Sequence, residues 1–132
     1  MFSKDMLIGI ILSCSKFDLH LSRCDKSKIG YRVRLRLNIR GNKDFLLAIE
    51  RTLLQYEIES TFKEEEHKTR PRPILKIGGI LNLYKLSEII PDTLPDLRGE
   101  WSEVRKAIDI VANKQHLTLE GMEQLFELKG VI

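Results

Sequence analysis

The sequence predicts an α+β fold in which helices cover one face of a four-stranded antiparallel sheet. Two observations predict the sheet: a ten-residue stretch that strictly alternates apolar and polar residues, and two hairpin-like pairs of strand segments. A third observation predicts the helices, since segments of helical length precede, separate and follow the hairpins. One face of such a sheet stays open to solvent or to a ligand. We expect residues 1–132 to form a single domain, because this length is typical of one hydrophobic core.

The composition is that of a globular domain, with 42% hydrophobic and 31% charged residues. It argues against a disordered chain, and two cysteines do not make a disulfide framework. The longest apolar run, residues 6–12, is too short to span a bilayer, and we see no secretory signal pattern. The net charge is only +3, but residues 1–40 hold 9 Lys or Arg against 3 Asp or Glu. This asymmetry predicts a local basic surface.

The expected elements begin with a motif helix over about residues 3–15. Ser3 can cap this helix, and its centre is apolar on all sides. Such a helix either packs within its own core or pairs with a second copy, and Gly9 would permit close backbone approach. The other expected elements are strands 17–22 and 31–40, helix 44–56, strands 58–64 and 73–77, helices 81–90 and 100–113, and a last helix capped by Thr118 and ending near 129, with loops at 65–72 and 92–99.

The clearest signal is the strand expected over residues 31–40. Its odd positions are Tyr, Val, Leu, Leu and Ile, and its even positions are Arg, Arg, Arg, Asn and Arg. Side chains on one face of a strand are about 6.6–6.8 Å apart, so this row of like charges needs a polyanion or abundant solvent. Arg and Asn also read guanine and adenine edges. The row therefore indicates a nucleic-acid contact, with a solvated sheet face as the alternative. Its members are Arg32, Arg34, Arg36, Asn38 and Arg40.

Further basic and polar residues could join the same surface. Those of the neighbouring strands alternate with apolar residues, and those of the first turn could contact phosphate or be solvated. Arg70 and Arg72 frame the second hairpin loop with the same two alternatives, whereas the acidic run 64–66 argues against uniform phosphate contact there. The candidates added in this way are His20, Ser22, Lys26, Lys28, Lys63 and Lys76, and Thr61 could face the same way.

Residues 7–17, LIGIILSCSKF, resemble the LAGLIDADG motif of homing endonucleases and intron maturases. They share its length, the small glycine in its helix and the closing aromatic that opens the first strand. The resemblance covers nearly the whole chain, because the order of elements is similar to the αββαββα core of that family. The C-terminal stretch HLTLEGMEQLFELK also resembles the closing helices of the family. The resemblance implies a saddle-shaped sheet whose concave face lies on nucleic acid.

The resemblance also implies where catalysis would occur. In the family, an acidic residue at the C-terminal end of each motif helix helps to bind a divalent metal for phosphodiester cleavage. Here Cys14 stands at that position, and Asp18 lies inside the first strand as a poor substitute. A thiol is a poor ligand for Mg²⁺, which prefers oxygen. We therefore expect no catalytic residue, no cofactor and no cleavage. The histidines and cysteines also lack the spacing of a zinc site.

The resemblance implies a nucleic-acid-binding protein whose partner is DNA or RNA and whose two copies join through the motif helix. The expected interface residues are Leu7, Ile8, Gly9, Ile11 and Leu12. Two other functions stay open. One is an active, Mg²⁺-dependent homing endonuclease, and the other is an RNA-binding maturase or a structural component of a ribonucleoprotein such as an organellar ribosome. We expect no membrane partner and an intracellular, organellar location in mitochondria or plastids, with archaea as another source that the resemblance allows.

Overall fold

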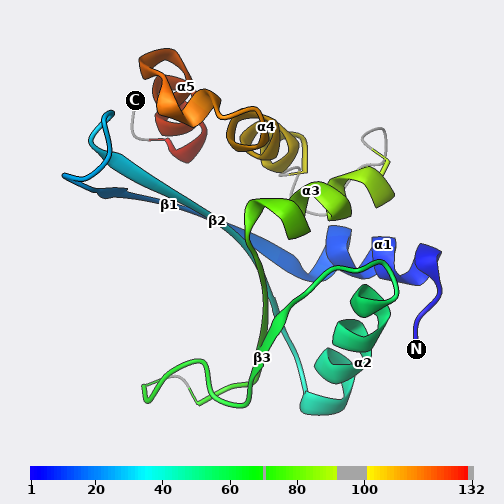
Figure 1. The fold of residues 1–132 in the computed structure, drawn as a ribbon. Coiled ribbons are helices and arrows are strands. Elements are labelled where there is room, and N and C mark those ends of the chain that lie inside the picture. Colours follow the sequence, from blue (N-terminus) through cyan, green and yellow to red (C-terminus); the bar gives the residue numbers. More distant parts are fainter. Residues whose placement is uncertain (70, 92–100, 131–132) are drawn as a thin grey trace.

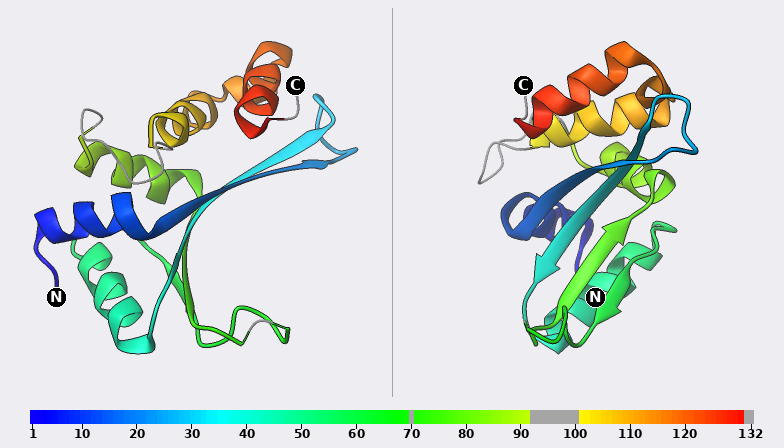
Figure 2. Two further views of the ribbon diagram at one scale, coloured as in Figure 1. Left: turned by 180° about the vertical axis from the view of Figure 1, so that it is seen from behind. Right: turned by 90° about the vertical axis from the view of Figure 1, so that its left-hand side faces the viewer.

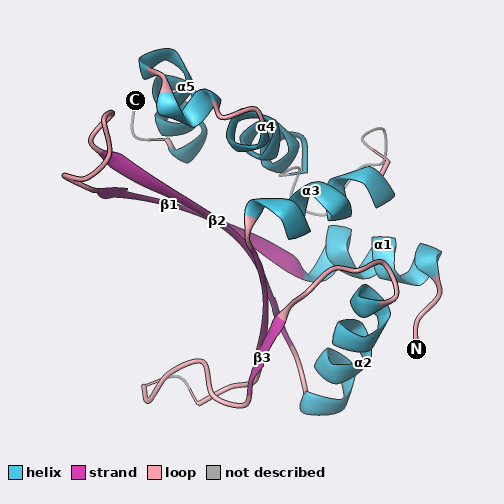
Figure 3. Cartoon of the chain, viewed as in Figure 1, coloured by secondary structure: helices cyan, strands magenta, loops and turns pink. Residues whose placement is uncertain are grey.

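The computed structural model describes residues 1–69, 71–91 and 101–130, and these residues form an open sheet with helices on one side (Figures 1 and 3). The first part of the chain contains α1 (Lys4–Cys14), β1 (Ser15–Arg23), β2 (Tyr31–Arg40) and α2 (Lys43–Leu54). The second part contains β3 (Thr61–Lys63), β4 (Ile74–Gly78), α3 (Ile80–Ile89), α4 (Trp101–Ala112), the 3₁₀ turn η1 (Gln115–Leu117) and α5 (Leu119–Lys129). This arrangement confirms the expected α+β fold.

The four strands form one antiparallel sheet in the order β1-β2-β4-β3. In the register, even-numbered residues of β1, β2 and β4 lie opposite even-numbered residues, and Thr61 of β3 lies opposite Lys76. The alternation seen in the sequence therefore continues across the whole sheet, because residues that lie opposite one another share a face. The sheet curves, so the first hairpin and the loop after β3 project to the same side, away from α1, α2 and α3 (Figures 1 and 2).

The hydrophobic core lies between the sheet and the helices. In β2 the odd residues Leu35, Leu37 and Ile39 are buried, whereas three of the even residues are exposed. Helix α5 extends this packing over the first hairpin, where the rings of Tyr31 and Phe126 meet edge to face with centroids 5.1 Å apart. Among the residues that the structure describes, no helix is long and apolar enough to cross a membrane.

Helix α1 corrects the expected interface. Ser3 caps it by accepting a hydrogen bond from the Met6 amide, as expected. However, the predicted interface residues Leu7, Ile8 and Ile11 are buried in the core of the single chain, with 0%, 8% and 1% of their surface exposed. Since the helix is apolar on all sides, the sequence alone could not show which side its own sheet covers. The other expected interface residues, Gly9 and Leu12, are exposed and half-buried respectively.

Strand β3 is shorter than the predicted strand 58–64. Glu57 has a left-handed φ of 59°, and the amide of Glu59 donates to Asn82 Oδ1 of α3 at 3.0 Å instead of pairing in the sheet. Ile58 is fully buried, so this segment anchors α3 to the core before the strand begins. The remaining helices and strands begin and end within about two residues of the expected positions, and the expected loop 92–99 lies outside the described residues.

Candidate nucleic-acid interface

The face of the sheet opposite the core is a basic surface that we name the basic face. It is built by the side chains that alternate with the buried residues of the strands. Figure 2 shows that no helix covers it. Its members are Lys16, Asp18, His20 and Ser22 of β1, Arg32, Arg34, Arg36, Asn38 and Arg40 of β2, Thr61 and Lys63 of β3, and Lys76 of β4. The structure thus places on one surface all the strand residues that the sequence singled out.

The register arranges this surface in rows across the sheet. Asn38 lies between Lys16 and Lys76, with Thr61 beyond, and the next row contains Asp18, Arg36 and Gly78. Lys16 was missed in the sequence, although it alternates with core residues in the same way as His20. Lys26 and Lys28 lie exposed in the turn at the far end of the first hairpin. Arg70 lies outside the described residues.

Arg36 occupies the centre of the basic face and is held by a carboxylate. Its NH2 group lies 3.2 Å from Asp18 Oδ2, and the two side chains are 29% and 41% exposed. On the other side, Gly78 leaves room for the arginine, since a Cβ atom at this glycine would lie 3.4 Å from Arg36 Cγ. The buried Nε of Arg36 has no hydrogen-bond partner among the described residues. Arg36 is therefore fixed in place by Asp18, and its buried Nε is not accessible to a ligand.

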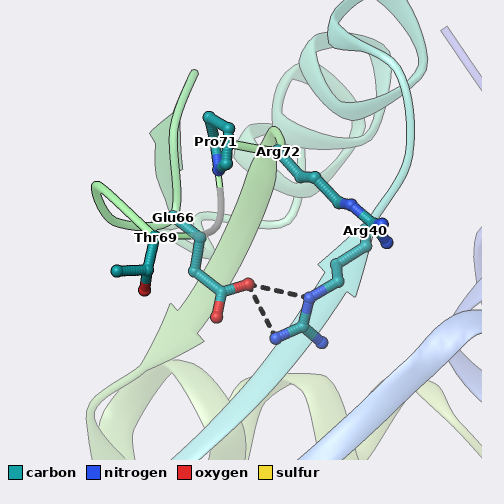
Figure 4. A pocket seen from close by; sticks show the side chains of 5 residues that line it. All are labelled: Arg40, Glu66, Thr69, Pro71 and Arg72. Atoms are coloured by element: carbon teal, nitrogen blue, oxygen red, sulfur yellow. Dashed lines mark hydrogen bonds and ion pairs between the residues drawn. The ribbon is translucent and has the colours of Figure 1, made fainter.

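A second carboxylate holds the end of the arginine row (Figure 4). Glu66 Oε1 lies 2.8 Å from both Nε and NH2 of Arg40, and the Glu66 amide donates to the Arg72 carbonyl at 2.9 Å. Nearby, Lys43 Nζ contacts Glu64 at 2.7 Å, and this hydrogen bond lowers the pKa of the Glu64 carboxyl and raises that of the lysine. Two residues of the acidic run 64–66 thus neutralise cations at this corner of the sheet.

A pocket of about 380 Å³ opens on the basic face between β2, β3 and β4. It is lined by Arg36, Glu59, Ser60, Thr61, Lys63, Lys76, Gly78 and Asn82. Burial, followed by the charges of Lys63 and Arg36, lowers the pKa of Lys76. Ser60 Oγ, which is buried, has no hydrogen-bond partner among the described residues. Crowded cations beside an unsatisfied hydroxyl suit an anion or a polar base edge.

The C-terminal end of α1 carries Cys14. Cys14 is exposed there, with its Sγ 3.5 Å from Ser13 Oγ, and Asp18 is engaged by Arg36. Within the described residues, no group of three or more His, Cys, Asp or Glu side chains could hold a metal.

The outer side of α1 is uncovered. Met6 is 54% exposed, and Gly9 and Ser13 are exposed on the same side of the helix. A Cβ atom on Gly9 would meet nothing within 4 Å, so the missing side chain is not needed for packing within this chain. The Ser13 hydroxyl donates to the Gly9 carbonyl at 2.6 Å, so its hydrogen bond is made within the helix. This side of α1 is available to a partner.

Solved structures similar to this chain are LAGLIDADG homing endonucleases. The homing endonuclease I-TnaI is 20% identical with a TM-score of 0.80, over 96% of this chain and 85% of that protein. The LAGLIDADG meganuclease I-CpaMI bound to uncleaved DNA is 19% identical with a TM-score of 0.79, and the LAGLIDADG homing endonuclease I-LtrWI bound to target DNA is 20% identical with a TM-score of 0.80. The chain covers 45% and 44% of these two proteins, and they cover 98% and 99% of it.

The chain therefore has the LAGLIDADG homing endonuclease fold, as the sequence motif indicated. By sequence, no known protein family matches it, and no curated protein matches it either. At identities of 19–20%, the likeness is one of fold.

Replacing Lys76 by glutamine should stabilise the fold. The pKa of Lys76 is lower in the folded chain than in the unfolded chain. Between these two pKa values the unfolded chain binds more protons, so the free energy of unfolding rises with pH there. Below this pH range the charged amine costs stability. We expect Lys76→Gln to raise the free energy of unfolding at pH 7, measured by urea denaturation. Lys106→Gln, on exposed α4 surface, is the control and should change little. A destabilised Lys76→Gln would contradict this account.

Proposed function

We propose that the protein binds double-stranded DNA through the basic face, as one half of a homodimer, and does not cleave it. The observation that carries this proposal is the uncovered row of arginines on β2. Arg32 and Arg34 have no carboxylate partner among the described residues, and they project from a sheet face that no helix covers. The similar structures of I-CpaMI and I-LtrWI, which are bound to DNA, support the same choice of ligand.

The dimensions of the sheet agree with duplex DNA. The major groove is about 12 Å wide and admits a two-stranded β-ribbon, and β1 and β2 form such a ribbon over nine paired residues. The backbone of B-DNA carries about one negative charge per 1.7 Å of its axis, so each Lys or Arg that approaches a phosphate releases a condensed counterion. Binding would thus relieve the repulsion among the cations of the basic face.

The homodimer is proposed from the surface of α1. The chain spans less than half of I-CpaMI and of I-LtrWI but 85% of I-TnaI. The uncovered side of α1, with Met6, Gly9 and the half-buried Ile10 and Leu12, supports pairing there. Gly9 would then allow the two helix backbones to approach closely.

The residues at the end of α1 support the proposed absence of cleavage. Metal-dependent hydrolysis needs a cation that activates water and stabilises the charge that develops on the attacked and leaving oxygens. Cys14 supplies a thiol at the position where the family resemblance implies a carboxylate, and Asp18 is paired with Arg36. We therefore propose a binding protein in preference to an active endonuclease.

Removing one unpaired arginine should weaken DNA binding and its dependence on salt. For Arg34→Ala, we expect the slope of log affinity against log salt concentration to fall in magnitude by about 0.9 for each phosphate of duplex DNA that the arginine neutralises. Arg51→Ala, which removes an equal charge from α2, is the matched control. Fluorescence anisotropy with labelled duplex DNA measures both. An equal slope in both variants would indicate that the basic face is merely solvated. Stronger binding to structured RNA than to duplex DNA would favour the ribonucleoprotein role.

Blocking the uncovered side of α1 should prevent dimer formation. A leucine at position 9 would project from the helix into open space in the single chain but between the two backbones in the dimer. We expect light scattering to report a dimer for the unmodified protein and a monomer for Gly9→Leu, with unchanged circular dichroism. As a control, Leu81→Ala alters an exposed leucine on α3 and should leave the dimer intact. An unmodified protein that is monomeric with and without DNA would contradict the proposed assembly.

The unmodified protein should not cut DNA that it binds. A single-turnover assay on a selected binding site, with Mg²⁺ or Mn²⁺ at saturating protein, should show no double-strand break. Cys14→Asp restores an acidic oxygen ligand at the end of α1 and should increase Mg²⁺ binding, measured by calorimetry. Specific cuts by the unmodified protein that disappear with chelator would contradict this proposal and favour an active, metal-dependent endonuclease.

A further inference from the structure

The basic face carries two kinds of arginine. Arg36 and Arg40 are held by the carboxylates of Asp18 and Glu66 at 3.2 and 2.8 Å, whereas Arg32 and Arg34 have no ion pair among the described residues. A free arginine side chain follows the strongest negative potential, which in DNA is that of the phosphates. A held arginine is ordered before binding and therefore loses less conformational entropy when it binds. The two kinds are thus suited to different parts of the DNA.

Arg36 is the held arginine that is placed to meet a base. It lies in the middle of the sheet, on a strand with neighbours on both sides, whereas Arg40 lies at the end of β2 beside the 64–72 loop. Gly78 lies opposite Arg36 and has no side chain that would crowd the arginine. Arg36 and Gly78 also line the pocket on the basic face. Asp18 is the only hydrogen-bond partner of the Arg36 guanidinium within the described residues. Because Nε is buried, the two terminal amino groups are the donors left for a base edge.

We propose that Arg36 is the residue of the basic face that determines sequence preference, by donating to the O6 and N7 atoms of a guanine, and that Asp18 is its positioning residue. This inference rests on the DNA binding proposed above and adds the base that is recognised. Paired donation to these two acceptors in the major groove is the geometry in which a guanidinium distinguishes guanine from the other bases.

Charge favours a guanine over a phosphate at this position. The Asp18 carboxylate cancels much of the Arg36 charge and would repel a phosphate that approached the same guanidinium. A guanine edge is neutral and offers two acceptors, so it does not meet this repulsion. Lys16 and Lys76 lie in the next row, on either side of Asn38, and can contact the phosphates that flank the base. The ion pair therefore converts one cation of the row from a general DNA contact into a selective one.

Selection of bound sequences from a randomised duplex library tests this inference. The unmodified protein should select guanine at one position, once in each half of the site. Arg36→Ala and Arg36→Lys should lose about 5- to 100-fold of the preference at that position, which is the usual effect of one paired contact. The lysine variant keeps the charge and should keep its affinity for random DNA. Arg34→Ala is the matched control: its affinity should fall for every sequence, with the selected bases unchanged.

The variants of Asp18 separate positioning from a structural role. Asp18→Ala frees Arg36 and removes a negative charge, so the guanine preference should weaken while affinity for random DNA rises. Asp18→Glu keeps a carboxylate and should retain more of the preference than the alanine variant. Circular dichroism and thermal unfolding should be nearly unchanged, since both side chains are partly exposed.

The outcomes distinguish the two proposals. Specific DNA binding with the same selected bases in Arg36→Ala would overturn the role of Arg36 and leave the proposed function intact. Binding without any sequence preference would do the same. Unchanged preference in Asp18→Ala, with loss only in Arg36→Ala, would overturn the role of Asp18. An unmodified protein that binds no duplex DNA at low salt would overturn both the inference and the proposed function.

Discussion

The structure depends on the strict two-residue alternation of β2, which separates apolar from charged side chains at the centre of the sheet. β2 pairs with β1 on one side and with β4 on the other, so its alternation sets the faces of both neighbours. Leu35, Leu37 and Ile39 enter the core, and Arg36 and Asn38 between them are directed away from it. A shift of the register by one residue would bury the arginines and expose the core, which makes this register strongly specified.

The same alternation creates an electrostatic cost that the fold only partly compensates. Cations from four strands share one face, and the lowered pKa of Lys76 records the effect of Lys63 and Arg36 in addition to burial. Asp18 and Glu66 offset part of the repulsion through Arg36 and Arg40. The remaining repulsion is intrinsic to a surface suited to a polyanion. On the proposed function, this repulsion lowers the stability of the free protein and is relieved when DNA binds.

The sequence predicted the strands better than the surfaces. Alternation is a local property, so the faces of β2 could be assigned before the structure was known. The side of α1 that meets the sheet could not, because its residues are apolar all round and only the tertiary packing places Leu7, Ile8 and Ile11 in the core. The ion pair between Asp18 and Arg36 depends on register between strands, and the short β3 depends on a contact with Asn82. Both contacts join residues that are distant in sequence.

In this fold, the residues that would bind DNA and those that would cleave it lie on different elements and differ in how closely they are tied to the core. Cys14 is exposed at the end of α1, and the buried residues of that helix end at Ile11, so a different side chain at position 14 would cost no core packing. The arginines of β2, in contrast, alternate with residues of the sheet that include the buried Leu35, Leu37 and Ile39. A change at the end of α1 therefore leaves the basic face undisturbed. The proposed function, DNA binding without cleavage, needs no difference in the core or in the sheet.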